Sequence, residues 1–264
     1  MKIENASFSY DSSRQIFHNI NIQTVSGELF CLMGRNGCGK STLLDCILGI
    51  HSLQEGRILL ADKDIGTYKP MELARHISYV PQVHIKSFPY KVKQVVLMGR
   101  TVYLGNLGVP QNKDKQIVEQ VLAEVGISEL AERPYTQLSG GEMQLVVLAR
   151  ALAQTTPIIV MDEPTAHLDF YNELMFLEKT AQLILEKKRT VLMATHSPNQ
   201  AFFLENCGIP VRVGLMYEGQ FYAVGKPKDI LSTDNMHKVY GIESRLLQDG
   251  GWRQLMPVRT DKEY

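Results

Sequence analysis

Nine residues near the amino end have the types and spacing needed to hold the phosphates of a nucleotide. They follow the apolar stretch 29–33 and precede the apolar stretch 43–48, which predicts a strand, a loop and a helix in that order. Glycines let successive backbone N–H groups face one centre, and the start of the helix adds partial positive charge. The candidate residues of this phosphate loop are Gly34, Arg35, Asn36, Gly37, Cys38, Gly39, Lys40, Ser41 and Thr42.

Two side chains of the loop extend its chemistry beyond the backbone. Lys40 is placed to reach the terminal phosphates, and Ser41 offers a hydroxyl to Mg²⁺. A chance glycine-rich turn is a poor alternative, because every fixed position of the G-x-x-x-x-G-K-[ST] pattern is matched. Kinases, GTPases and many ATPases share this loop, so it predicts a nucleoside triphosphate as ligand and leaves the reaction open.

A pair of carboxylates ends a second apolar stretch, 158–161. Asp162 and Glu163 come at the carboxyl end of this predicted strand, where an α/β sheet presents acids to its ligand. Adjacent residues of a strand end point in different directions, so Asp162 is the candidate for Mg²⁺, shared with Ser41, and Glu163 is the candidate base for water. The alternative is two solvated acids in a loop before Pro164.

Hydrolysis of a phosphate also needs groups that hold the attacking water. His196 follows the predicted strand 191–195, which brings it to the same sheet edge as Glu163, and Gln82 follows the apolar stretch 79–81 and is a candidate for Mg²⁺ or water. Taken alone, each would be an ordinary surface or loop residue.

Composition excludes several classes of protein. The 264 residues are 44% apolar, as in a packed globule, and carry 28 basic and 28 acidic side chains. A neutral chain lacks the broad basic surface of nucleic-acid-binding proteins, so no nucleic acid is expected as partner. No stretch approaches the roughly 18 to 20 apolar residues that span a bilayer, and the first residues resemble no signal peptide, so we expect a cytoplasmic protein.

The cysteines and histidines give no sign of a structural metal or a disulfide. The four cysteines form no C-x-x-C pair and three of them lie in or beside the phosphate loop, so we interpret them as reduced packing residues. The seven histidines lack ligand spacing. The expected metal is the Mg²⁺ that accompanies the nucleotide.

Periodicity predicts an α/β fold with a helical insertion. Segments 2–10 and 16–25 alternate like half-buried antiparallel strands, and the short apolar stretches are typical of buried parallel strands. These stretches are 58–60, 77–80, 157–161 and 190–194. Helical spacing dominates 90–99, 112–126, 142–154 and 171–188. We therefore expect one domain over 1–240 with a helical subdomain inserted at about 89–154, followed by an appendage, 241–264, of unknown role.

The segment 138–142, Leu-Ser-Gly-Gly-Glu, resembles the signature of ABC ATPases, and it lies between the phosphate loop and the Asp-Glu strand as in that family. The resemblance covers about residues 1–240 and implies a P-loop (RecA-like) ATPase core with an antiparallel β layer. It also implies that Tyr10 stacks on adenine, that Gln82 is the Q-loop glutamine, that His196 is the switch histidine and that 166–169, ending in Asp169, is the D-loop. Two departures, His167 in the D-loop and Met143 after the signature, remove no catalytic group.

The signature also makes physical sense by itself, because Ser139 and the N–H groups of Gly140 and Gly141 stand at a helix start and form an anion site. A glycine-rich helix cap is the alternative. In the family, two such domains lie head to tail, and each signature closes on the ATP held by the phosphate loop of the other. The resemblance therefore implies a second copy of this chain as partner, with ATP and Mg²⁺ at two shared sites.

A motor with no membrane span is expected to act through separate transmembrane permease subunits. Segments 87–90 and 95–101 are similar to the metal-chelate importer group, which favours uptake of an iron-siderophore, haem or cobalamin, with molybdate or tungstate as the alternative. The resemblance implies a peripheral position on the cytoplasmic face of the membrane and an indirect link to a substrate-binding protein. Phe88, Tyr90 and Met98 are candidates for a groove that receives the permease, and core packing explains them equally well.

A soluble ABC ATPase of ribosomes or DNA is the remaining class. Family members of the first kind usually carry two motors per chain, and those of the second split the motor with a long coiled coil. This chain has one motor, no heptad tract and no excess of basic residues, so transport is the favoured interpretation.

Overall fold

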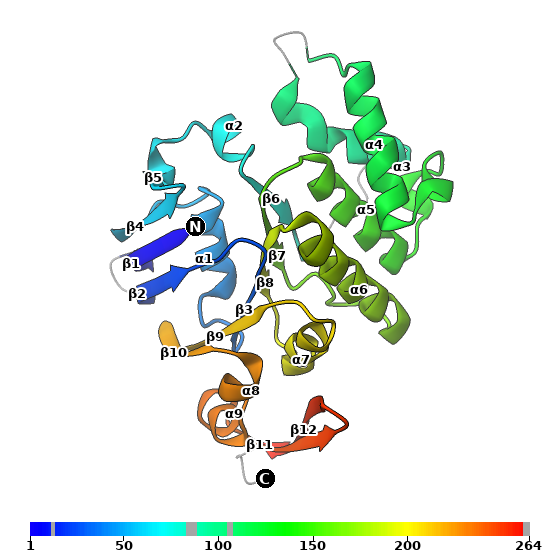
Figure 1. Ribbon diagram of the computed structural model, residues 1–264. Coiled ribbons are helices and arrows are strands. Elements are labelled where there is room, and N and C mark those ends of the chain that lie inside the picture. Colours follow the sequence, from blue (N-terminus) through cyan, green and yellow to red (C-terminus); the bar gives the residue numbers. More distant parts are fainter. Residues whose placement is uncertain (12–13, 83–88, 105–107, 261–264) are drawn as a thin grey trace. The chain divides into compact units, whose positions relative to one another are not determined.

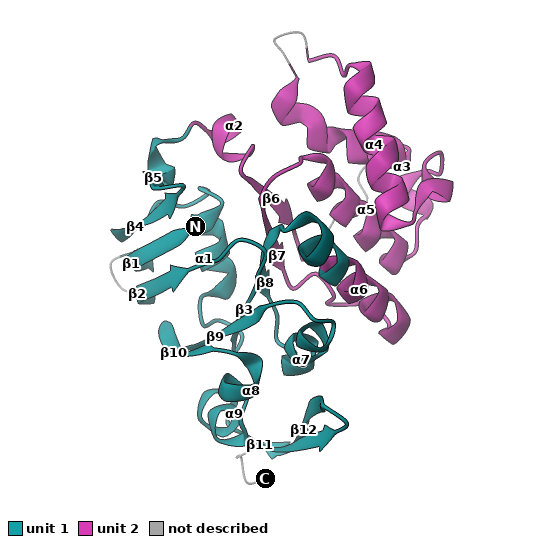
Figure 2. Cartoon of the chain, in the orientation of Figure 1, with its two compact units in different colours: residues 1–68, 181–264 teal, residues 69–180 magenta. Residues whose placement is uncertain are grey.

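The strand and helix patterns of the sequence appear in a computed structural model of the chain, which describes residues 1–11, 14–82, 89–104 and 108–260 (Figure 1). These residues form two compact units, one of residues 1–68 and 181–264 and the other of residues 69–180 (Figure 2). The first unit is therefore built from both ends of the chain, and the second is built from its middle.

The first unit opens with an antiparallel sheet in the strand order β2-β1-β4-β5. The predicted alternation of buried and exposed residues shifts by one position within the first strand, since the odd-numbered Ile3 and the even-numbered Ala6 are both buried. Between them Asn5 has φ of 48°, and the pairing register shifts there, as in a β-bulge. A Cβ on Gly56 would lie 2.3 Å from the Asn5 carbonyl oxygen, so the neighbouring strand needs glycine at this point. The strands are β1 (Lys2–Ser9), β2 (Gln15–Gln23), β4 (Glu55–Leu60) and β5 (Lys63–Asp64).

Parallel strands form the buried centre of the same unit. Strand β3 (Leu29–Gly34) is buried along its whole length, as a strand covered on both faces must be. It pairs in parallel with β8 (Thr190–Ala194) on one side and with β9 (Val211–Tyr217) on the other. Strand β10 (Gln220–Gly225) adds an antiparallel edge to β9. The loops that follow β3 and β8 therefore leave the sheet at one edge, toward helices α1 (Lys40–Ile47) and α7 (Pro198–Asn206).

The last described residues, for which no periodicity predicts an element, form regular structure. Helix α9 (Thr233–Tyr240) ends at Gly241, which is left-handed with φ of 65°, and the chain then makes an antiparallel hairpin. The turn of the hairpin consists of Gly250 and Gly251, whose φ values are 53° and 92°. Two positive φ angles match the twist of a two-residue hairpin turn, so the pair of glycines was a usable signal. The remaining elements are α8 (Pro227–Ile230), β11 (Ile242–Asp249) and β12 (Trp252–Thr260).

Helices fill most of the second unit, and all but the short first one coincide with the segments of helical spacing. Among them α3, α4 and α5 pack against one another (Figure 2). Strands β6 and β7 pair in parallel. The elements are α2 (Pro70–Leu73), β6 (Ile77–Val80), α3 (Val92–Leu97), the 3₁₀ helix η2 (Met98–Tyr103), α4 (Asn112–Val125), α5 (Gly140–Ala153), β7 (Ile158–Asp162) and α6 (Phe170–Lys187), which continues into the first unit; short 3₁₀ turns lie at 65–67, 128–130 and 135–137.

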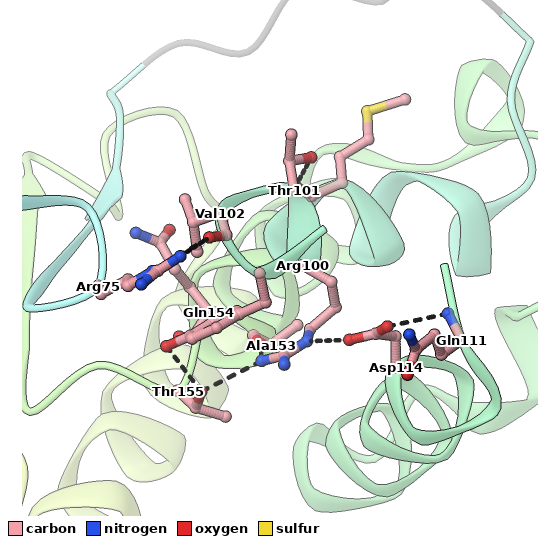
Figure 3. Close-up of polar contacts among 11 residues, drawn as sticks. Arg75, Arg100, Thr101, Val102, Gln111, Asp114, Ala153, Gln154 and Thr155 are labelled. Atoms are coloured by element: carbon pink, nitrogen blue, oxygen red, sulfur yellow. Dashed lines mark hydrogen bonds and ion pairs between the residues drawn. The ribbon is translucent and has the colours of Figure 1, made fainter. Parts of the chain in front are cut away.

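A buried ion pair fastens η2 to α4 in the second unit (Figure 3). Arg100 Nε donates to Asp114 Oδ1 at 2.9 Å and Nη1 donates to the Ala153 carbonyl oxygen at 2.8 Å. The guanidinium also lies 4.0 Å from the centre of the Tyr103 ring. Arg100 is only 5% exposed, so these partners replace the water that the charge would otherwise require.

The fold class is confirmed: the chain is an α/β protein with an antiparallel sheet, buried parallel strands and, in the middle of the sequence, a series of helices. Every segment predicted as a strand contains one, and each helical spacing coincides with a helix. No helix in the described part of the chain has the length and apolar character required to cross a bilayer.

Candidate nucleotide site

The phosphate loop has the backbone that its glycines predicted. It joins the buried end of β3 to the first residue of α1, and Gly34, Gly37 and Gly39 have φ values of 152°, 81° and 102°. Those angles are ordinary only for glycine. At Gly34 space is also limiting, because a Cβ would lie 2.6 Å from the Met216 carbonyl oxygen. The loop therefore packs closely against β9, and the first residue of α1, Lys40, lies within the turn of the loop.

Lys40 lies within this curl. Its side chain is 5% exposed, and Nζ donates to the carbonyl oxygens of Gly34 at 2.9 Å and Arg35 at 3.3 Å. The two carbonyls hold the ammonium at the centre of the loop, where it can exchange them for phosphate oxygens. Ser41 follows at the exposed start of α1, so its hydroxyl is accessible to a ligand.

The cysteines around the loop are packing residues, as the sequence suggested. All four are free, and Cys31 and Cys46 are buried. Burial raises the pKa of the thiols of both Cys31 and Cys46 to about 12, so they stay protonated and unreactive near neutral pH. Cys38, in the loop itself, lies 2.7 Å from where a Cβ of Gly34 would be, which is a second reason for glycine there.

Tyr10 lies beside α1, the helix that follows the phosphate loop. Its hydroxyl is 3.3 Å from Thr42 Oγ1, and its ring is 60% exposed. His51 meets the Tyr10 ring edge-on at 5.5 Å between centroids and stacks on Phe8 at 5.3 Å. An exposed ring held in place from behind is suited to stack on a base. Sequence reasoning missed His51, which follows α1 and has no motif of its own.

His196 is placed by the pairing of β3 and β8. Leu32 pairs with Ala194, and the Thr195 N–H donates to the Leu32 carbonyl at 3.1 Å, so the loop after β8 leaves the sheet beside the phosphate loop. His196 is exposed at that edge. The first unit thus brings together three of the predicted groups: the phosphate loop, Tyr10 and His196.

In the second unit the ends of β6 and β7 bring two predicted groups into contact. The amide Nε2 of Gln82 donates to Glu163 Oε2 at 3.2 Å. Strand β7 is buried throughout, and Asp162, its last residue, is 7% exposed. Glu163 has φ of 42°, a left-handed conformation that turns the chain sharply after Asp162. The two carboxylates are therefore directed differently, one into the protein and one toward Gln82.

The signature segment forms a capping box at the start of α5. Ser139 Oγ accepts from the Glu142 N–H at 3.3 Å, and Glu142 Oε2 accepts from the Ser139 N–H at 2.8 Å. That N–H, with the side chain of Arg133 at 3.2 Å, holds the pKa of the Glu142 carboxyl below its usual value. A Cβ on Gly140 would meet nothing within 4 Å, so the backbone at the start of the helix is open to a ligand.

Gly141 connects the signature to the D-loop. A Cβ at Gly141 would lie 2.2 Å from the side chain of Asn172, so glycine allows α5 and α6 to meet there. Asn172 donates from its backbone N–H and from Nδ2 to the two carboxylate oxygens of Asp169, both at 2.8 Å. The hydrogen bond from the Asn172 backbone N–H is the main reason why the pKa of Asp169 lies below its usual value. Sequence reasoning missed Asn172, although an Asp at a helix start followed three residues later by Asn is a cap signal.

The other expectations concern the D-loop, a permease groove and metals. His167 in the D-loop is exposed and left-handed, with φ of 76°. Of the candidate groove residues, Tyr90 and Met98 are each 44% exposed, and Phe88 lies outside the described residues. Within the described ranges no cluster of three or more His, Cys, Asp or Glu could hold a metal ion.

Comparison with known proteins identifies the family. Residues 17–166 match the family described as ABC transporter. An ABC transporter ATP-binding protein of Haemophilus influenzae is 38% identical over 94% of this chain and 91% of its own length. The molybdate import ATP-binding protein MolC of the same organism is 33% identical over 91% and 87%, and the iron(3+)-hydroxamate import ATP-binding protein FhuC of Bacillus subtilis is 31% identical over 89% and 86%. A solved structure, described as an inward-facing conformation of a metal-chelate type ABC transporter, is 31% identical, covers 97% of this chain and 96% of its own, and has a TM-score of 0.83.

Proposed function

Since the chain belongs to the ABC transporter family as an ATP-binding subunit, we propose that it hydrolyses ATP to power import of a metal chelate through separate permease subunits. The cargo class is of the iron-siderophore, haem or cobalamin type. The observation that supports the proposal is that one chain has two features suited to bind anions, the glycine loop around Lys40 in one unit and the open helix start of the signature in the other.

The phosphate loop binds the ATP phosphates, and Tyr10 supports the adenine ring. Lys40, held in the loop by two carbonyls, moves its donors to the terminal phosphates when ATP enters. Glu163 accepts the proton of the attacking water, and the Gln82 amide fixes the direction of that carboxylate. His196 contributes a donor near the γ-phosphate from the loop after β8.

The donor chemistry also fits Mg²⁺. The Ser41 hydroxyl, the Asp162 carboxylate and the Gln82 amide oxygen are hard oxygen ligands, which this ion prefers. When bound, Mg²⁺ would neutralise charge on the β- and γ-phosphates. Asp162, buried at the end of β7, would supply the protein carboxylate that holds the ion.

Two copies of the chain complete two sites. Ser139 and the N–H groups at the start of α5 would contact the γ-phosphate of the ATP held by the other copy, with Asp169 fixing Asn172 behind them. Each copy contributes half of either site, so ATP closes the dimer and hydrolysis releases it. The closing motion is passed to permease subunits at the cytoplasmic face of the membrane, where the chain lies peripherally and is linked to a substrate-binding protein only indirectly.

A sharp test uses Glu163→Gln. The variant should bind ATP as the native chain does, hydrolyse it at least a hundredfold more slowly, and accumulate a dimer in ATP that sedimentation can detect. A matched control is Glu173→Gln, a neighbouring acid on α6. Normal turnover by Glu163→Gln, or a monomer at saturating ATP, would overturn the proposal.

The molybdate importer is the second candidate, favoured by the identity with the molybdate relative. Reconstitution with the permease and binding protein distinguishes the two, because only the correct cargo stimulates ATPase activity. Stimulation by an iron chelate or cobalamin supports the first candidate, and stimulation by molybdate alone replaces it. Copurification with ribosomal RNA or DNA instead of a membrane protein would contradict both.

A further inference from the structure

One asparagine ties the C-terminal hairpin to helix α7. Asn199 Nδ2 donates to the carbonyl oxygen of Leu255 at 3.1 Å, and the Leu255 N–H donates back to Asn199 Oδ1 at 2.8 Å. Leu255 is 4% exposed, whereas Met256 beside it on β12 is 40% exposed. The side-chain amide thus pairs with the backbone of β12 as a neighbouring strand would.

His196 lies in the short loop between β8 and α7, three residues before Asn199. Thr195 Oγ1 donates to Gln200 Oε1 at 2.6 Å and accepts from the Ser197 N–H at 3.1 Å. Thr195 and Gln200 are 2% and 4% exposed, so these bonds are shielded from water. These bonds tie Thr195, which precedes His196, to Ser197 and Gln200, which flank the segment that carries Asn199.

The hairpin has further attachments within its unit. Arg253 on β12 lies 3.8 Å from Glu205 near the far end of α7, and β11 packs on α9. No hairpin residue in the described range 242–260 takes part in the pairing of β3 with β8 or in the hydrogen bonds that hold Lys40 in the phosphate loop. The hairpin can therefore be loosened from α7 with the phosphate cradle left intact.

We propose that the C-terminal hairpin is a positioning element for the switch histidine, with Asn199 as the positioning residue that holds His196 at the angle needed for hydrolysis. The inference rests on the proposed function and assigns a role to residues 242–260. It goes beyond a merely structural contact because two neutral hydrogen bonds add little to the free energy of unfolding, while they fix the direction of the side chain closely.

The test is Asn199→Ala in the full-length chain. We expect its kcat for ATP hydrolysis to fall about fivefold to tenfold, while the Kd for a fluorescent ATP analogue stays within twofold. Asn199→Asp, whose second carboxylate oxygen would face the Leu255 carbonyl oxygen in place of the donor Nδ2, should lose activity as Asn199→Ala does. The control is Asn206→Ala, an exposed asparagine at the end of the same helix, which should match the native chain.

A double-mutant cycle shows whether the effect passes through His196. In a His196→Ala background, adding Asn199→Ala should reduce the residual rate no further. An NMR signal of the His196 ring, identified by its loss in His196→Ala, should shift in Asn199→Ala and stay unchanged in Asn206→Ala.

Three results would overturn the inference. The first is a native kcat in Asn199→Ala, the second is a full additional loss in the His196→Ala background, and the third is an unshifted histidine signal. Thermal melting of each variant gives the folded fraction, so that rates are compared per folded molecule. Failure of the proposed function looks different, because the native chain itself would then show no ATPase activity that depends on Glu163.

Discussion

Gln82 and Glu163 are 81 residues apart in the sequence, yet the Gln82 amide donates to the Glu163 carboxylate at 3.2 Å. The parallel pairing of β6 with β7 explains the contact, because each residue follows the carboxyl end of its strand. The residue proposed to bind Mg²⁺ and the residue proposed to accept a proton are therefore directly linked. A displacement of Gln82 would remove one hydrogen bond that directs the Glu163 carboxylate.

Gln82→Ala should lower kcat about tenfold and leave ATP affinity within twofold, because the variant loses the direction of the base and keeps the phosphate loop. Steady-state ATPase kinetics and a nucleotide titration measure the two quantities. The control is Gln182→Ala, which removes an exposed amide on α6. Gln154→Ala is unsuitable, because the Gln154 amide donates to the backbone carbonyl of Ile77 and its loss would disturb the fold. A large rise in Kd for Gln82→Ala would contradict this role.

Lys40→Ala should weaken ATP binding by a hundredfold or more, because the loop loses the only side-chain ammonium that its carbonyls hold in the described structure. Calorimetric titration with ATP measures the loss. Lys63→Ala, which removes an ammonium stacked on Tyr68 in the same unit, should bind ATP normally. Equal affinities of the two variants would count against the phosphate role.

Substitution of Ser139 can separate its capping role from its proposed phosphate role. Ser139→Ala removes the cap and should lower the free energy of unfolding by about 1 kcal/mol. Ser139→Asp retains a good cap and favourable charge at the helix start, so stability should stay near native, yet its carboxylate would repel the γ-phosphate and stop hydrolysis. Chemical denaturation and ATPase assays decide. An active Ser139→Asp would show that the signature does not face phosphate.

Tyr10→Ala should weaken ATP binding about fivefold to thirtyfold through loss of the ring, in line with roughly 1 to 2 kcal/mol for stacking on a base. Tyr10→Phe keeps the ring and gives up only the contact between its hydroxyl and Thr42, so it should bind nearly as the native chain does. Fluorescence titration compares them. A defect in Tyr10→Phe as large as in Tyr10→Ala would assign the effect to the hydroxyl.

The Arg100–Asp114 pair predicts an acid-sensitive second unit. Burial disfavours the Asp114 carboxylate, but the hydrogen bonds from Arg100 and from the Gln111 N–H outweigh it and leave the pKa below the usual 3.8. A carboxyl with a depressed pKa stabilises the fold above its unfolded pKa, and this contribution is lost as the pH falls through the folded pKa. Thermal unfolding should therefore show a loss of stability below about pH 4.

Asp114→Asn should abolish that part of the pH dependence and leave Arg100 as a buried charge without its counter-ion. The expected cost at neutral pH is about 3 to 5 kcal/mol of unfolding free energy. Denaturant titrations at several pH values measure both effects. Asp234→Asn, at the start of α9 in the other unit, is the control. An unchanged acid profile in Asp114→Asn would show that other carboxyls control acid unfolding.

The sequence by itself determined the local chemistry of this protein. The glycine spacing of 34–42 required a phosphate loop, the capping box of 139–142 required a helix start, and apolar periodicity gave the strands and helices. These features depend on residues close together in the chain, so local sterics and hydrogen bonding are sufficient to specify them.

Only the tertiary structure decided which distant groups meet. Strand pairing joined Gln82 to Glu163, and packing placed Asn172 behind Gly141 and Asn199 against Leu255. Hydropathy cannot encode such contacts, because an asparagine that clamps a strand and one that faces water look alike in the sequence. The physical reason is that a polar side chain gains its role from the partner that folding brings to it, and that partner comes from another part of the chain.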